Sequence, residues 1–263
     1  MNIRKEFLKE LVSKSKENKL IEKEYITNFI DSILYNHNVN TKFRNIFDAY
    51  AEYGSKEISV DYNKIVNSYK YFIKGKEKNY FESNLEILHI ILHEMEHFYQ
   101  DFKVNHNNLE GIILNYGINS LTKKAISTEK TVNDIYDKTY NINPSERLAD
   151  YYAAKYLLEA IENNKDLDKF NELYDIANNL LIDSMMRGYR KVDGKFLSIP
   201  FKEYMIKTGC ESKLNNLSFY SYDNKKFYKL ASSNMNLEER FKYGFIVKNT
   251  EYNYLLSKKK IIV

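Results

Sequence analysis

Apolar residues recur at helical spacing over residues 3–35 and 41–53, where Ile, Leu, Phe and Tyr stand among Lys and Glu. A period near 3.6 residues indicates amphipathic helices. Gly54 then suits a helix end. The pattern changes to alternating apolar and polar residues at Glu57–Tyr62 and Ser68–Ile73. Strict alternation is typical of short strands, so we expect a small sheet here.

Helical spacing returns in the later part of the chain. Asp193-Gly194 predicts a turn, and residues 220–228 predict a hairpin around Asp223-Asn224. The overall pattern therefore predicts an α+β fold that is mostly helical. The expected helices run from a cap at Ser83 or Asn84 to about Val104, from Asn143-Pro144 to about Asn163, over 166–187 and over 237–245.

The helix expected over residues 85–104 has two chemically different faces. Histidines on the polar face are not explained by packing in a core. The apolar side carries Leu88, Ile91, Leu92, Met95, Phe98, Tyr99 and Phe102, and the other side carries Glu86, His89, His93, His97 and Gln100.

Composition narrows the class of protein. The 263 residues have a formal net charge of +4 with Lys and Glu mixed along the chain, which gives no argument for direct nucleic-acid binding. A single cysteine, Cys210, excludes an internal disulfide and fits a reducing compartment. The charged N-terminal residues lack the apolar core of a signal peptide, and no apolar run could span a bilayer. We therefore expect a cytoplasmic protein without a membrane partner.

The polar face carries the pentad His93-Glu94-Met95-Glu96-His97. Histidines four residues apart lie about 6 Å apart on one helix face, which suits two ligands of one tetrahedral zinc ion. A nearby carboxylate can take a proton from water that zinc acidifies. The helical wheel does not choose between Glu94 and Glu96, and a solvated polar face is the alternative interpretation.

Two histidines do not complete a metal site. In the segment Asn143–Asp150, Asn143 can cap the next helix with Pro144 in its first position. Glu146 then lies in the first turn, and Asp150 follows it by four residues on the same face. Glu146 can be the third ligand, or it can reach back to the backbone of Asn143 in a capping box. In the second case Asp150 becomes the metal ligand.

The pentad followed by Phe-Tyr-Gln, together with Asn-Pro-Ser-Glu-Arg-Leu-Ala-Asp, resembles the zincin metallopeptidases. The pattern is similar to the gluzincin branch, and to the ImmA/IrrE-type zinc peptidases of bacterial mobile elements. The metzincin glycine and third histidine are missing. The resemblance, over about residues 55–160, implies that His93, His97 and Glu146 hold zinc and that Glu94 is the general base. It also implies that Asp150 orients His93 through its other ring nitrogen.

We expect one zincin-like domain over residues 1–263, with a small sheet beside the pentad helix, around the part of the chain that carries the resemblance. It would comprise a helical N-terminal region 1–54, a metallopeptidase core 55–190 and a C-terminal extension 191–263. The implied activity is hydrolysis of peptide bonds in an intracellular protein with one Zn²⁺ ion. A repressor-like regulator is the candidate substrate. The alternative is a zincin fold kept as a binding or regulatory module without turnover.

Other residues near these motifs have candidate roles. His89 lies one turn before His93, and one straight helix does not easily bring three successive turns to one metal ion. We therefore expect His89 to support a ligand, to face substrate or to be exposed. Tyr151 and Tyr152 can offer a phenol to substrate. Arg147 is expected at the surface or near a ligand. The predicted strands could bind extended substrate by edge pairing.

Overall fold

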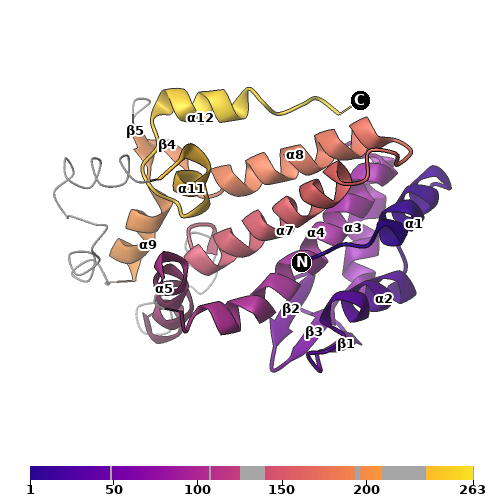
Figure 1. The fold of residues 1–263 in the computed structure, drawn as a ribbon, viewed down its shortest axis with the longest axis horizontal. Helices are drawn as coiled ribbons and strands as arrows, with labels where there is room; N and C mark the ends of the chain where they lie inside the picture. Colours follow the sequence, from indigo (N-terminus) through magenta and orange to yellow (C-terminus); the bar gives the residue numbers. More distant parts are fainter. Residues whose placement is uncertain (48, 107, 125–139, 193–195, 209–234, 263) are drawn as a thin grey trace. The chain divides into compact units, whose positions relative to one another are not determined.

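The computed structural model describes residues 1–47, 49–106, 108–124, 140–192, 196–208 and 235–262. These residues form many helices and two small sheets, so the expected α+β class with mostly helical content is confirmed (Figure 1). No helix among them combines the length and apolar character needed to cross a bilayer. The chain divides into two compact units, with unit 1 formed by Met1–Tyr99, Tyr152–Leu181 and Lys259–Val263 and unit 2 by Gln100–Tyr151 and Ile182–Lys258. The expected single domain stays a prediction.

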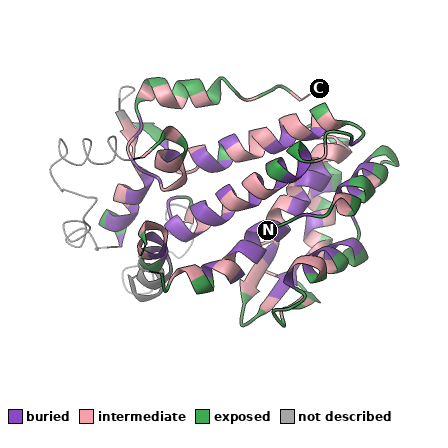
Figure 2. Ribbon diagram, viewed as in Figure 1, coloured by how far each residue is buried: buried purple, intermediate pink, exposed green. Residues whose placement is uncertain are grey.

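Unit 1 begins with two helices, which confirms the helical spacing over residues 3–35. They are α1 (Lys5–Lys16) and α2 (Lys23–Leu34). The chain leaves the first helix at Asn18, whose φ of 56° lies in the left-handed region that Asn tolerates better than most residues. Most apolar residues of both helices are buried, whereas their charged residues are exposed or half-buried (Figure 2).

The helix expected over residues 41–53 is wrong, because this segment supplies two strands. They are β1 (Asn40–Phe43) and β2 (Ala51–Gly54), and both pair with β3 (Glu57–Val60). The order is β1-β3-β2, with β1 parallel and β2 antiparallel to β3. Ser55 and Lys56 both have positive φ, 52° and 60°, which suits a two-residue hairpin turn between β2 and β3. The strand expected at Glu57–Tyr62 is confirmed in its first four residues.

The strand expected at Ser68–Ile73 is also wrong, because these residues belong to α3 (Tyr62–Lys74). Asp61 caps this helix by accepting the Lys64 N–H at 3.0 Å. Tyr71 is 70% exposed, so an aromatic residue on the solvent side produced the false alternation. The proposed edge pairing fails at both expected strands, since one is helical and β3 is the central strand. The outer strands are β1 and β2.

The pentad belongs to α4 (Tyr80–Lys103). Its expected cap at Ser83 or Asn84 is wrong, because both residues are buried within the helix. Asn79 instead accepts the Glu82 N–H at 2.8 Å. The expected apolar face packs in the core of unit 1, with Leu88, Ile91, Leu92 and Met95 inaccessible and Phe98 2% exposed, whereas Phe102 is 56% exposed.

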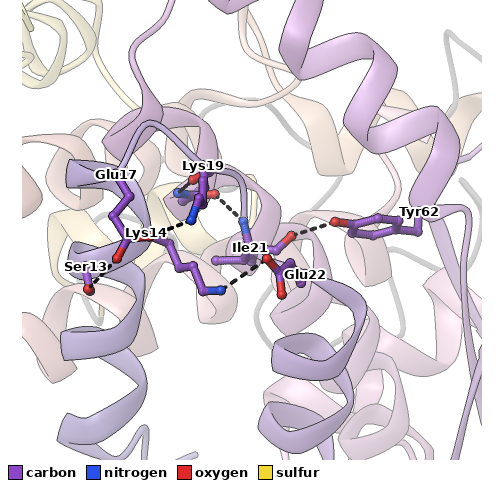
Figure 3. Close-up of polar contacts among 8 residues, drawn as sticks. Ser13, Lys14, Glu17, Lys19, Ile21, Glu22 and Tyr62 are labelled. Carbon is purple, nitrogen blue, oxygen red and sulfur yellow. Dashed lines mark hydrogen bonds and ion pairs between the residues drawn. The ribbon is translucent and has the colours of Figure 1, made fainter.

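Two contacts tie α4 to neighbouring parts of unit 1. The Phe98 ring meets the Tyr53 ring of β2 edge-on at 6.1 Å between centroids, so the small sheet lies beside the pentad helix. The Asn84 amide serves the loop between α1 and α2. It accepts the Ile21 N–H at 2.8 Å and donates to the Lys19 carbonyl at 3.0 Å. Figure 3 shows this loop, where Tyr62 also donates to the Ile21 carbonyl at 3.1 Å.

The helices expected over 143–163 and 166–187 are confirmed as α7 (Pro144–Glu162) and α8 (Phe170–Met186). The helix expected over 237–245 is confirmed as α11 (Leu237–Lys242), which Asn236 and Glu239 begin with a capping box. Asp193-Gly194 and residues 220–228 lie outside the described residues. Elements that the pattern did not predict are α5 (Leu109–Lys124), β4 (Arg190–Val192), β5 (Phe196–Ser198), α9 (Pro200–Lys207) and α12 (Asn249–Leu256).

Arg147 is fully buried in unit 2, so the expectation of a surface position is wrong. One of its guanidinium nitrogens donates to the carbonyl groups of Met185 and Phe241, at 3.3 and 2.5 Å. The guanidinium also lies over the Tyr189 ring, 5.3 Å from its centroid. Desolvation lowers the pKa of Arg147 to about 10. The arginine thus joins α7 to the ends of α8 and α11.

Candidate metal centre

The two pentad histidines direct one nitrogen each toward a common point. The Nε2 atoms of His93 and His97 are 3.1 Å apart, and the ring planes cross at 83°. Two imidazole ligands of a tetrahedral zinc, each about 2.05 Å from the metal, would place their nitrogens about 3.3 Å apart. Two nitrogens at this distance can share one proton or bind one cation. The spacing therefore suits a shared metal ion.

Glu146, in the first turn of α7, offers a third ligand atom. One ligand atom each from His93, His97 and Glu146 all lie within 4.8 Å of one another. His93 is buried, whereas His97 and Glu146 are half-buried. Two imidazole nitrogens and one carboxylate oxygen are a donor set that binds metal ions, and three protein ligands leave a coordination position open. The group can therefore bind a metal ion.

The start of α7 bears on the two interpretations of Glu146. Asn143 caps the helix as expected, because its side-chain oxygen accepts the Ser145 N–H at 3.0 Å. The N–H group of Asn143 donates to the Tyr140 carbonyl at 3.2 Å. In a capping box this N–H would have donated to the Glu146 carboxylate. The Tyr140 carbonyl thus accepts the N–H group that the Glu146 carboxylate would accept in a capping box. This favours the interpretation of Glu146 as a metal ligand over its interpretation as a cap.

The carboxylates of the pentad lie in different surroundings, although both are buried. Glu94 is 8% exposed and Glu96 is inaccessible to solvent. Glu96 accepts a hydrogen bond from the Tyr156 hydroxyl of α7 at 3.1 Å. The alternative of a solvated polar face is therefore wrong for this part of α4, and His89 on the same face is half-buried. The tyrosine contact gives Glu96 a packing role between helices.

Asp150 has a partner that the sequence did not reveal. Its carboxylate forms an ion pair with Arg187, which follows the last residue of α8. Tyr140 is a second residue near the site that the sequence did not reveal. Burial raises the pKa of its hydroxyl, and the nearby Glu146 carboxylate raises it further. Nothing in the local pattern marks either residue, since Arg187 meets Asp150 across 37 positions of sequence. The expected orientation of His93 by Asp150 stays a prediction.

The two tyrosines with expected substrate contacts occupy different surroundings. Tyr151 is 3% exposed, and its hydroxyl donates to Glu238 of α11. Tyr152 is half-buried and its ring stacks on Tyr156, 5.9 Å between centroids. The phenol of Tyr151 is thus engaged by a carboxylate of the C-terminal part of the chain. The substrate-facing roles of His89, Tyr151 and Tyr152 stay predictions.

A cavity of about 530 Å³ lies in unit 1, where the chain passes between β1 and β2 and into α3. None of the candidate site residues lines it. Its walls are formed by Asn45, Ile46, Phe47, Asp61, Asn63 and Lys64.

No family model, curated protein or solved structure matches this chain. The zincin-like fold and the peptidase activity therefore stay predictions that rest on the two motifs. The structure itself shows a mostly helical α+β chain in which two histidines and a glutamate can bind a metal ion.

Proposed function

We propose that this chain is a zinc-dependent metallopeptidase. The observation that carries the proposal is the convergence of His93, His97 and Glu146, whose ligand atoms lie within 4.8 Å of one another. These residues come from two motifs separated by about fifty positions, and each motif alone would be weak support. Zinc is favoured over harder cations because two of the three donors are imidazole nitrogens.

The residues around this group have separate roles in the proposed reaction. Zinc held by the three ligands would polarise a water molecule and the carbonyl group that it attacks. Glu94 accepts a proton from the attacking water on its carboxylate and passes it to the leaving nitrogen. Its low exposure, 8%, keeps bulk water away from that carboxylate. Asp150 would hold His93 in one orientation.

The proposed substrate is a protein or peptide inside the cell, with a repressor-like regulator as the candidate that the motif resemblance suggests. An extended segment could add to an outer strand of the sheet, where backbone groups are available for pairing. Of the two outer strands, β2 is the better candidate, because its Tyr53 ring contacts Phe98 at the end of the pentad turn. One Zn²⁺ ion is the proposed cofactor.

Burial favours a second function, a metal-binding module without turnover. His93 is 6% exposed and Glu94 is 8% exposed, which is little access for a polypeptide substrate. The cavity of unit 1 is lined by other residues. A module of this kind would bind zinc and recognise a partner through its surface. Glu94 argues against it, because a binding module needs no general base at this position.

The decisive experiment measures zinc and hydrolysis in the same preparations. Elemental analysis of wild-type protein is expected to give one zinc per chain, and Glu146→Gln is expected to lose most of it. Glu159→Gln is the matched control, because Glu159 is exposed on the same helix. Undiminished zinc in Glu146→Gln would remove Glu146 from the ligands.

Hydrolysis is followed with an unfolded protein substrate and a mixture of quenched fluorescent peptides. Cleavage that a chelator stops and that added zinc restores would support the peptidase and exclude the binding module. Stoichiometric zinc without cleavage of any peptide would support the module.

A further inference from the structure

Arg187 contacts the first two turns of α7 at two points. Its Nη1 atom pairs with the Asp150 carboxylate, and the same atom lies 3.5 Å from the Glu146 carbonyl oxygen. Residues four apart in a helix are joined by one backbone hydrogen bond. The guanidinium therefore spans the turn that separates the proposed ligand from the residue proposed to orient His93.

Tyr140 adds a third contact to the same cluster. The Arg187 guanidinium lies over the Tyr140 ring, 4.7 Å from its centroid. The Glu146 carboxylate and the Arg187 guanidinium lie near the Tyr140 hydroxyl and shift its pKa in opposite directions, Glu146 upward and Arg187 downward. Tyr140 also accepts the Asn143 N–H through its carbonyl, so it is fixed to the start of α7. Arginine and tyrosine together enclose the first turn of this helix.

The position of Arg187 beside the N-terminus of α7 is electrostatically unfavourable unless a carboxylate lies next to the guanidinium. A helix N-terminus carries partial positive charge, and a cation beside it is destabilising. Arg147, in the same turn, is a fully buried cation, and Arg187 lowers its pKa further. A second cation at the positive end of α7 needs an anion beside it. The Asp150 carboxylate supplies that charge to Arg187, which ties the arginine to the residue proposed to orient His93.

The backbone directs Arg187 toward α7. Gly188 has a φ of 76°, a conformation that ends α8 and that side chains with a Cβ rarely adopt. A Cβ on Gly188 would lie 2.6 Å from the Asn141 carbonyl oxygen, just before α7. The close approach brings the end of α8 against the segment that begins α7. The ion pair between Arg187 and Asp150 thus lies next to a close contact between the two main chains.

We propose that Arg187 is a positioning residue of the metal centre, which holds Asp150 and the turn of Glu146 in the geometry that binds metal. The inference rests on the proposed function. Arg187 is not one of the three candidate ligands, and it acts through the carboxylate of Asp150 and the carbonyl of Glu146. Residues that support metal ligands in this way typically change metal affinity by about 10–100-fold when they are replaced.

The test uses Arg187→Gln in the full chain. Zinc affinity is measured by competition with a chromogenic chelator, and the visible absorption of bound Co²⁺ reports ligand geometry. Arg187→Gln is expected to lower zinc affinity about 10–100-fold and to change the Co²⁺ spectrum. Asp150→Asn should give a similar loss, and the double variant should lose little more, because both changes break one unit.

The control separates positioning from general stability. Arg240 forms an ion pair with Glu251 in the same unit, and its side chain is 11% exposed against 13% for Arg187. Arg240→Gln should lower the melting temperature of the metal-free protein about as much, with zinc affinity and Co²⁺ spectrum unchanged. Wild-type zinc affinity in Arg187→Gln, or equal losses of affinity in both variants, would overturn the positioning role. No zinc binding by the wild-type protein would instead overturn the proposed function.

Discussion

The Nε2 atoms of His93 and His97 face each other at 3.1 Å across one turn of α4. This relationship predicts that the two imidazoles act as a pair in metal binding. His93→Ala and His97→Ala should each reduce bound zinc to a small fraction of the wild-type content, because one remaining imidazole and Glu146 hold zinc weakly. His89→Ala, on the preceding turn, should retain it. Zinc content by elemental analysis distinguishes these outcomes, and loss of zinc in His89→Ala would enlarge the ligand set.

Substitutions of the two pentad carboxylates, Glu94 and Glu96, should have different effects. Glu94→Gln is expected to keep zinc and to lose hydrolysis by at least about 100-fold, the usual size of a general-base contribution. Glu96→Gln should keep hydrolysis per folded molecule and unfold more easily, because it alters a buried contact with Tyr156. Peptide cleavage and urea denaturation measure the two effects. The reverse pattern would assign the base to Glu96.

Acid should weaken unit 1 through Asp61. The N–H groups of Ile46 and Lys64 hold the pKa of the Asp61 carboxyl below its usual range. A carboxyl whose pKa is lower in the folded state stabilises the fold above its unfolded pKa, about 3.9, and loses that contribution as the pH falls through the folded value.

Asp61→Ala should therefore lower the free energy of unfolding by about 0.5–2 kcal/mol at pH 7, the usual cost of losing a helix cap. The difference from wild type should shrink below pH 4 in urea titrations. Asp31→Ala, at an exposed position on α2, is the control. A difference that stays constant with pH would show that the charge of Asp61 is not involved.

The apolar face of α4 should dominate its stability. Leu92→Ala, at a site inaccessible to solvent, should lower the free energy of unfolding by about 2–5 kcal/mol, because it removes buried contacts and leaves a cavity. Phe102→Ala, on the same helix at 56% exposure, should cost about 0.5 kcal/mol or less. Chemical denaturation compares them. Equal costs at the two sites would contradict the burial of this face.

Gly188 should tolerate no side chain. Gly188→Ala combines a left-handed backbone with an approach of 2.6 Å to the Asn141 carbonyl oxygen, so it should destabilise the protein by about 1–3 kcal/mol. Gly54→Ala is the matched substitution, because a Cβ there meets nothing within 4 Å. Thermal unfolding of both variants provides the comparison, and similar melting temperatures would contradict the strain at Gly188.

The helices α4 and α8 could be predicted from apolar spacing because local period and tertiary burial agree there, and α7 from the asparagine cap and proline at its start. Residues 41–53 could not, because short strands and a loop between them imitate helical spacing over so few positions. Tyrosine was the other source of error, since an exposed ring such as Tyr71 counts as apolar in any pattern.

For the candidate site, the histidine pair follows from one helix, and the place of Glu146 followed from a second motif. The choice between ligand and cap needed the backbone partner of Asn143, which no local pattern contains. Arg187 was missed for a similar reason. An ion pair across 37 positions depends on how the end of α8 meets α7, and a single sequence holds no signal for that meeting.

The amide of Asn84 has a consequence for dissecting this protein. It supplies the hydrogen bonds that the turn at Lys19–Ile21 would otherwise lack, and α1 and α2 share one continuous core with α4. The helical segment before residue 55 is therefore part of the scaffold on which the pentad stands. A shortened version that begins at residue 55 would expose the apolar side of α4 to water and would leave the Asn84 amide without its hydrogen-bond partners at Lys19 and Ile21. Expression of a minimal fragment that carries the candidate metal centre should thus keep the N-terminal helices.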